Sequence, residues 1–257
     1  MKNYKANFNF FDKIDTPQKA YWLGFIWADG YIAKRNRSLP NGKMRVEYNL
    51  KLAIKDSDSG HVQKFLDDIE SDYPVHYYKT SGFNDYEIFE ARAFITNLHM
   101  CSKLYEEYGI IPRRYDATNV ISVIPEKLYR YFILGLFDAD GSFTCYSGHY
   151  GDKMNVSFGG SEQLLRFIES TLVGQGVIDK AKTESGVRSL ITRHKGKDGT
   201  WRTIAFPGIP QASKILNWLY KDSVIHLDRK YEKYLSVPYL REDRISCWVK
   251  RKEKIKK

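Results

Sequence analysis

A nine-residue phrase that occurs twice constrains the fold of this chain more than any other feature. The first copy, WLGFIWADG, covers residues 22–30, and the second, ILGLFDADG, covers residues 133–141. The aspartates before the final glycines, Asp29 and Asp140, are 111 residues apart in a chain of 257 residues. Because a repeat at a fixed spacing indicates repeated structural units, the sequence predicts two pseudo-equivalent halves.

Each phrase is predicted to end a helix. TPQKAY supplies Thr16 as an N-cap and Pro17 at the first helical position, and IPEKLY supplies Pro125 at that same position. We expect Gly30 and Gly141 to terminate the two helices in the left-handed conformation, which glycine adopts without steric cost. The segments that follow, YIAKRNR and SFTCYS, are predicted to be strands.

The rest of the first half is predicted to add a strand, a helix, a hairpin and a helix. Apolar and polar residues alternate from Val46 to Lys55, as in a half-buried antiparallel strand. DSDSGHVQKFLDDIE has the spacing of an amphipathic helix, and VHYYKTSGFNDYEIFEA that of a hairpin with its turn at residues 82–85. With a helix near NLHMCSKLYEEYG, the element order is αββαββα.

The second half repeats this order. MNVSF is predicted to be a strand, SEQLLRFIESTLVGQG a helix capped by Ser161, SLITRHKGKDGTWRTIAF a hairpin and QASKILNWLYKD a helix. The fold class is therefore α+β. We expect a first half at residues 1–108, a linker at 109–123, a second half at 124–240 and a basic C-terminal tail at 241–257.

Composition favours a polyanionic partner and an intracellular location. Lysine and arginine number 41 against 31 aspartates and glutamates, a net charge of +10, which indicates nucleic acid before a membrane surface. The three cysteines are odd in number and form no CxxC pair, as expected in a reducing compartment. The most apolar stretch, residues 129–137, is too short to span a bilayer, so we expect a soluble protein without a membrane partner.

Small residues within the phrases predict close packing of the two helices. Gly24 and Ala28 lie four residues apart, as do Gly135 and Ala139, so each helix has a stripe of small residues on one face. If these faces pack around a pseudo-twofold axis, the helix ends and their two aspartates lie side by side.

Two carboxylates at the negative ends of two helices favour a bound cation. Mg²⁺ prefers oxygen ligands and suits such a pair together with DNA phosphates, and Mn²⁺ or Ca²⁺ would fit the same site. The simpler alternative is that ADG only stops a helix, although two copies at this spacing on a basic chain argue against it. An EF-hand is excluded because Leu136 and Ser147 occupy two of its acidic ligand positions.

At these phrases the chain resembles the single-chain, two-motif LAGLIDADG homing endonucleases, and the similarity in element order covers roughly residues 15–240. The resemblance implies two αββαββα halves with the motif helices at a central interface, and two antiparallel sheets that form a saddle over DNA. It also implies that Asp29 and Asp140 bind the catalytic divalent metal, and that cleavage across the minor groove leaves short 3′ overhangs.

The sequence departs from the family pattern in two places. The frequent earlier acidic residue of the motif is Trp27 in the first copy and Asp138 in the second, a position that is usually structural. Family members often carry Gln-Lys at the end of the second strand; this chain has Ile54-Lys55, and Gly159-Gly160 at the matching point of the second half. Lys55 is therefore a candidate catalytic residue, or simply a solvated lysine. The second half-site is expected to be unequal or to use another basic residue, such as Lys153 or Arg193.

Sequence recognition is expected from the polar strand faces, because a two-stranded ribbon fits the major groove and Arg, Lys and Asn can recognise base edges. A hairpin register wrong by one residue would invert the faces. The candidate DNA contacts are Arg35, Arg37, Arg45, Asn49 and Lys51 in the first half, and Thr144, Tyr146, Lys153, Asn155, Ser157, Arg193, Lys195 and Arg202 in the second.

These observations favour a monomeric, metal-dependent, sequence-specific DNA endonuclease that makes a double-strand break. A catalytically silent RNA maturase or DNA-binding regulator with the same fold is the main alternative. A structural phosphate-binding protein would show shallow sequence preference and steep salt dependence. An intein is disfavoured because the chain has no splicing residue at Met1 and no His-Asn pair at its end.

Overall fold

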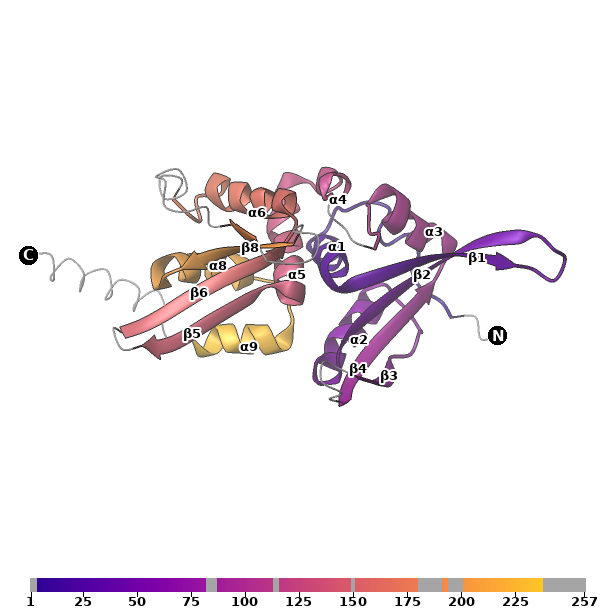
Figure 1. Ribbon diagram of the computed structural model, residues 1–257, viewed down its shortest axis with the longest axis horizontal. Helices are drawn as coiled ribbons and strands as arrows, with labels where there is room; N and C mark the ends of the chain where they lie inside the picture. The colour runs from indigo at the N-terminus through magenta and orange to yellow at the C-terminus, as the bar shows by residue number, and fades with distance from the viewer. Residues whose placement is uncertain are drawn as a thin grey trace, which may run out of the picture. The chain divides into compact units, whose positions relative to one another are not determined.

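The computed structural model describes residues 4–81, 87–112, 116–148, 151–179, 191–193 and 201–237 (Figure 1). The chain divides into two compact units, residues 1–139 and 140–257, which we describe separately. Across the described residues, the helices are all too short or too polar to cross a membrane.

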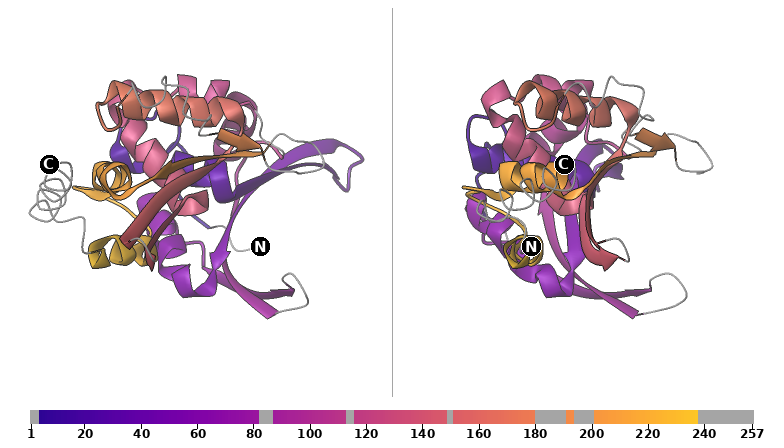
Figure 2. Two further views of the ribbon diagram at one scale, coloured as in Figure 1. Left: turned by 60° about the vertical axis from the view of Figure 1, so that its left-hand side comes forward. Right: turned by 90° about the vertical axis from the view of Figure 1, so that its left-hand side faces the viewer.

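Unit 1 is an antiparallel sheet of four strands with helices on one face (Figure 2). The strand order is β1-β2-β4-β3, and the apolar face of β2 and β4 buries Leu50, Leu52 and Ile95 beneath the helices. The elements are α1 (Pro17–Asp29), β1 (Gly30–Ser38), β2 (Met44–Lys55), η1 (Asp56–Asp58), α2 (Ser59–Asp68), β3 (His76–Ser81), β4 (Glu87–Thr96), α3 (Leu98–Ser102), the π-helix η3 (Lys103–Glu107), α4 (Thr118–Ser122), η4 (Glu126–Leu128) and α5 (Tyr129–Asp140).

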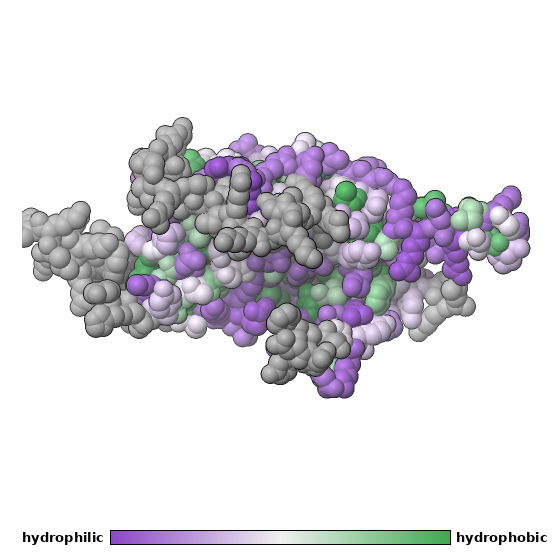
Figure 3. Space-filling model, viewed as in Figure 1, coloured by the Kyte–Doolittle hydropathy of each residue, from purple (hydrophilic) through white to green (hydrophobic). Residues whose placement is uncertain are grey.

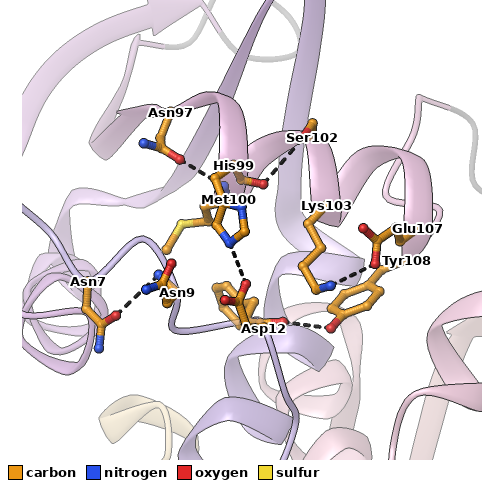
Figure 4. Close-up of polar contacts among 11 residues, drawn as sticks. Asn7, Asn9, Asp12, Asn97, His99, Met100, Ser102, Lys103, Glu107 and Tyr108 are labelled. Atoms are coloured by element: carbon orange, nitrogen blue, oxygen red, sulfur yellow. Dashed lines mark hydrogen bonds and ion pairs between the residues drawn. The ribbon is translucent and has the colours of Figure 1, made fainter.

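The N-terminal segment of unit 1 is fastened to the α3–η3 region (Figure 4). The His99 Nε2 atom lies 2.6 Å from the Asp12 Oδ1 atom, and the Tyr108 hydroxyl donates a 2.6 Å hydrogen bond to the Phe11 carbonyl. Asn97 caps α3 by accepting a hydrogen bond from the Met100 amide at 2.8 Å. These contacts hold the α3–η3 region in place beside the sheet.

Unit 2 repeats the sheet topology with strand order β5-β6-β8-β7. Phe158 and Phe206 from the sheet and Leu165 and Leu216 from its helices are buried in the core. The elements are β5 (Ser142–Gly148), β6 (Gly151–Gly160), α6 (Glu162–Gly174), β7 (Ile191–Arg193), β8 (Arg202–Pro207), α8 (Ile209–Tyr220) and α9 (Asp228–Ser236).

The predicted α+β class and αββαββα order are confirmed in both halves. Thr16 and Ser161 are N-caps as predicted, and α1 and α5 end at the two motif aspartates. The predicted turn at residues 82–85 and the loop of the second-half hairpin lie outside the described residues. The short α4 and the C-terminal α9 are additions that the pattern did not predict.

Two local predictions about the motif helices are wrong. Gly30 has φ −73° and ψ 149°, an extended conformation, and Gly141 likewise has no positive φ. Because α1 runs directly into β1, glycine is required at position 30 for space, since a Cβ there would come within 2.6 Å of the Ile26 carbonyl oxygen. Pro125 precedes a 3₁₀ turn, η4, so it is not the first residue of α5.

Candidate active site and nucleic-acid interface

The two motif helices pack against each other at their glycines. A Cβ atom added to Gly24 would collide with the carbonyl oxygen of Phe132, and one added to Gly135 would collide with that of Tyr21. Both glycines are buried. The close approach of α1 and α5 that the small residues predict is therefore present at this pair, since only a hydrogen in place of a side chain lets the backbones meet.

A buried polar network accompanies this packing. The Tyr21 hydroxyl donates a 2.8 Å hydrogen bond to the Asp138 Oδ2 atom and lies 2.9 Å from the His61 Nε2 atom. The exposed fractions are 1% for Asp138 and 2% for His61, so the carboxylate is enclosed between helices. Trp27, at the corresponding position of α1, is also buried. This burial agrees with a structural role for the position.

The candidate metal ligands end the two motif helices. Asp29 is the last residue of α1 and is half-buried, whereas Asp140 is the last residue of α5 and is exposed. Each carboxylate lies at the negative end of a helix dipole, where a cation is favoured. Among the described residues, no group of three or more histidine, cysteine, aspartate or glutamate side chains is arranged to hold a metal ion by itself.

The register of the first sheet places the predicted DNA-contacting residues on one face. Tyr31 pairs with Lys51 and Arg37 with Arg45 across β1 and β2, and paired residues project from the same side of a sheet. The opposite side carries the buried Leu50 and its neighbours. The polar face therefore includes all five predicted contacts of the first half together with Lys55: Arg35, Arg37, Arg45, Asn49, Lys51 and Lys55.

The β1–β2 hairpin continues beyond the rest of this sheet. β4 pairs with β2 only as far as Asn49, opposite Thr96, whereas β1 and β2 stay paired to Ser38 and Met44. Figure 1 shows the hairpin leaving β4, and Figure 3 shows mostly hydrophilic residues along it. We call residues 34–48 the ribbon extension. Three of the predicted contacts lie on it: Arg35, Arg37 and Arg45.

The same face carries an aromatic cluster that sequence reasoning missed. The Arg92 guanidinium stacks 4.4 Å from the centre of the Tyr78 ring and forms a 2.8 Å ion pair with Glu90. Tyr78 and His76 each lie about 6 Å from the Phe94 ring, at 5.9 and 6.1 Å between centroids. The alternation of residues in EIFEARAFIT shows which side chains lie on the same face of β4. It does not show whether that face is the buried or the polar face of the sheet.

Lys55 has no lysine counterpart in the second half. The residue after each motif glycine gives a common reference point for the two sheets: Tyr31 pairs with Lys51, and Ser142 pairs with Ser157. Four residues beyond these partners stand Lys55 in the first half and Ser161 in the second. The sequence match to Gly159-Gly160 is thus shifted by one residue. The Ser161 hydroxyl accepts a 3.4 Å hydrogen bond from the Leu164 amide and caps α6.

Neighbouring groups at this strand end differ as well. The Trp201 ring covers Gly159, where an added Cβ would lie 2.7 Å from the indole Cζ2 atom. Lys153, one proposed substitute for a catalytic lysine, is eight residues from Ser161 along an extended strand, roughly 26 Å at about 3.3 Å per residue. Lys153 therefore cannot serve the same strand end.

In the second sheet the register brings five predicted contacts together and puts two positions, 193 and 202, on the opposite face. Arg202 lies on the same strand face as the buried Ile204 and Phe206, and it forms an ion pair with Glu162 at the start of α6. This gives Arg202 a role within the unit. Arg193 pairs with Arg202 in the ladder, and Lys195 lies outside the described residues. The residues that share the polar face are Thr144, Tyr146, Lys153, Asn155 and Ser157.

Neither a scan against protein-family models nor a search of curated proteins found a match to this sequence. Solved structures do match. I-GzeII, a LAGLIDADG homing endonuclease in complex with its DNA target, is 11% identical with a TM-score of 0.56 over 86% of this chain and 87% of that chain. I-SmaMI bound to cleaved DNA is 14% identical with a TM-score of 0.54 over 91% and 94%.

I-AabMI bound to uncleaved DNA is 13% identical, with a TM-score of 0.53 over 89% of this chain and 92% of that chain. A further I-SmaMI structure holds uncleaved DNA in the presence of calcium ions, with a TM-score of 0.50. This chain has the LAGLIDADG homing endonuclease fold. At these identities, the similarity concerns the arrangement of the chain in space.

Within the LAGLIDADG fold of this chain, α9 brings two lysines to the end of the second motif. The Lys230 ammonium is buried, with 7% of the residue exposed, and donates a 2.5 Å hydrogen bond to the Gly141 carbonyl, directly after Asp140. Lys233 donates a 2.5 Å hydrogen bond to the Phe143 carbonyl. A buried lysine needs such partners, because an uncompensated charge inside a protein is costly. No pattern in the sequence indicates this contact, which joins residues 89 positions apart.

Proposed function

We propose that this chain is a sequence-specific, metal-dependent DNA endonuclease that acts as a single chain and makes a double-strand break with short 3′ overhangs. The observation that carries the proposal is the packing of α1 and α5 at Gly24 and Gly135, with each helix ending in an aspartate. Two equivalent acidic helix ends in one chain match a reaction that must be carried out on two DNA strands.

The proposed metal ligands are Asp29 and Asp140. The donor set fits Mg²⁺, and equally Mn²⁺ or Ca²⁺, because carboxylate oxygens at helix ends leave coordination positions for water and phosphate oxygens. When bound, the metal supplies Lewis acidity and a more acidic water for attack on phosphorus. Asp29 and Asp140 would hold the metal through their carboxylates at the ends of α1 and α5, where the helix dipoles also favour a cation.

We assign a basic residue to each half. Lys55 projects from the polar face at the end of β2, where an ammonium stabilises negative charge on a phosphate. In the second half, Lys230 approaches the motif end from α9 and holds the Gly141 backbone beside Asp140. The basic residues proposed for the two halves therefore come from different elements, β2 in the first half and α9 in the second.

DNA binding is assigned to the polar sheet faces. The two faces carry the aligned Arg, Lys, Asn, Ser and Thr side chains identified above, which can donate to phosphates and read base edges in the major groove. The ribbon extension supplies three arginines to the first face, and arginine is suited to bidentate contacts with guanine. The large number of basic residues, net charge +10, adds general attraction to the DNA backbone.

A maturase or regulator with this fold is the second proposal to be tested, because the same faces would bind nucleic acid without cutting it. The test is cleavage of a randomised double-stranded DNA library with Mg²⁺, with EDTA as control and sequencing of all ends. Staggered cuts at one long consensus that disappear with EDTA support the endonuclease. Selective retention of a DNA or intron RNA without cuts supports the binding protein instead.

A further inference from the structure

Glu106 joins both strands of the ribbon extension to the helical layer of unit 1. Its Oε1 atom accepts a 2.6 Å hydrogen bond from the Lys34 ammonium of β1 and a 2.5 Å hydrogen bond from the Tyr48 hydroxyl of β2. Lys34 and Tyr48 are themselves paired across the two strands. One carboxylate oxygen therefore ties together three elements: β1, β2 and η3.

The contact lies where the hairpin leaves the sheet. Asn49 is the last β2 residue paired with β4, and Tyr48 is the next residue outward. Beyond this point β1 and β2 have only each other as partners, and an isolated two-stranded hairpin is marginally stable in water. The Glu106 contact therefore acts at the root of the segment that carries Arg35, Arg37 and Arg45 on its opposite face.

The surroundings of Glu106 reinforce the contact. The Lys34 ammonium lies 5.5 Å from the Tyr48 ring centre and 5.7 Å from that of Tyr105, the residue before Glu106. Hydrogen bonds from Lys34 and Tyr48 lower the pKa of Glu106, and the bond to Glu106 raises the pKa of Lys34. Both groups therefore remain charged at neutral pH. Glu106 and Tyr105 belong to the π-helix η3, a rare geometry that is frequent at functional sites.

The second half has no equivalent contact among its described residues. At the positions that match Lys34 and Tyr48, Cys145 pairs with Met154, which cannot bind a carboxylate in this way. The residue of α8 that matches Glu106 is Asn217, which accepts a 3.0 Å hydrogen bond from Tyr234. The carboxylate contact is thus specific to the first hairpin, and the matching hairpin of the second half does not repeat it among the described residues.

We propose that Glu106 is a positioning residue for target recognition, which fixes the angle of the ribbon extension so that its arginines meet a defined set of base pairs. The proposal rests on the proposed DNA-binding function. Glu106 is therefore needed for base discrimination at the outer positions of the half-site that the first sheet reads. The chemical step does not depend on Glu106, because Glu106 makes its contacts on the face opposite to the arginines.

The test compares Glu106→Ala with Glu107→Ala on the target selected from the library. Glu107 is the adjacent residue and pairs with Lys103 instead of the ribbon, which makes it a matched control. Binding is measured in Ca²⁺ against every single-base variant of the target, and single-turnover cleavage is measured in Mg²⁺ at saturating DNA. We expect Glu106→Ala to weaken binding about 10-fold and to flatten the preference at the outer positions of one half-site, with cleavage at saturation unchanged.

Tyr48→Phe removes one of the two hydrogen bonds and keeps the ring, so it should flatten the same positions to a smaller extent. Glu106→Gln, which can still accept both hydrogen bonds without the charge, should restore part of the preference. An unchanged base profile for Glu106→Ala, or equal flattening in both half-sites, overturns the proposal. If the wild-type protein selects no target, the proposed function itself is contradicted. If the wild type selects a target and Glu106→Ala reads it with the same base preference, only the proposal about Glu106 fails.

Discussion

The two halves share a backbone plan but place their basic groups differently. In the first half, Lys55 stands at the end of β2 on the polar face. In the second, that position is Ser161, which caps α6, and the lysine beside the motif comes from α9 and is buried against Gly141. The hairpins differ too, since Glu106 joins the first to η3, whereas the described residues of the second half show no matching contact.

These differences show which parts of the repeat are required by packing and which are free to diverge. The motif glycines occur in both halves because the two helices approach so closely that a Cβ at either position would meet the backbone of the other helix. The basic groups differ between the halves, because Lys55 stands on the polar face at the end of β2 whereas Lys230 is buried against the Gly141 carbonyl. Substitutions at the two motif glycines should therefore have equal effects, whereas substitutions at Lys55 and Lys230 should have different ones.

The largest expected effect concerns the helix pair. Gly24→Ala and Gly135→Ala should each lower the free energy of unfolding by about 3 kcal/mol, because the added methyl group meets a backbone carbonyl that cannot rotate away. Urea denaturation measures the loss. Gly60→Ala in α2 is the control, since its Cβ meets nothing within 4 Å, and it should be neutral or slightly stabilising. A stable Gly24→Ala would show that the helices are not in close contact.

The second prediction separates the two lysines. Lys55→Met should slow the cut of one strand about 100-fold, as for loss of a group that stabilises transition-state charge, and Lys230→Met should slow the cut of the other strand. Strand-resolved cleavage with each 5′ end labelled measures both rates. Lys51→Met, on the same face as Lys55, should weaken binding without strand bias. Equal slowing of both strands by either variant would contradict separate roles.

The third prediction concerns the unequal motif position. Tyr21→Phe should lower the free energy of unfolding by about 2 kcal/mol, because it removes a hydrogen bond to the buried Asp138 carboxylate. The cleavage rate of the folded protein should be unchanged, since we assign no chemical role to Asp138. The check combines urea denaturation with single-turnover cleavage. Lost cleavage with unchanged stability would assign Asp138 a role in the reaction.

The smallest effect is expected at two helix N-caps that have no counterpart in the other half, Thr16 of α1 and Ser161 of α6. Thr16→Ala and Ser161→Ala should each cost about 1 kcal/mol, because each side chain accepts a hydrogen bond from an amide in the first turn of its helix. Ser170→Ala, exposed on α6, serves as the control and should change little. Denaturant midpoints compare the three variants. A much larger loss at Ser161 would show that this residue has a further role at the strand end.

Much of the architecture could be predicted from the sequence because its causes are local. Alternation from Val46 to Lys55 fixed the faces of β2, Thr16 and Ser161 marked helix starts, and paired small residues indicated close helix packing. Gly30 was misjudged because a glycine can be needed for space as well as for a left-handed turn, and sequence alone does not separate the two reasons.

The contacts that sequence reasoning missed are those between distant segments. Lys230 meets Gly141 across 89 positions and Glu106 meets Lys34 across 72, and no periodicity connects such residues. The face of Arg202 was also misassigned, because a shift of one residue in a short strand exchanges the two sides of a sheet. Tertiary placement, not propensity, determines these positions.

The most direct test of the central claim is single-turnover cleavage of the selected target by Asp29→Asn and Asp140→Asn, measured separately in Mg²⁺, with binding of each measured in Ca²⁺. If each phrase contributes one metal-binding aspartate, both variants lose double-strand cleavage by at least about 100-fold and bind the target within a few-fold of wild type. Double-strand cleavage at the wild-type rate by either variant, in a folded protein that binds its target, would contradict the account.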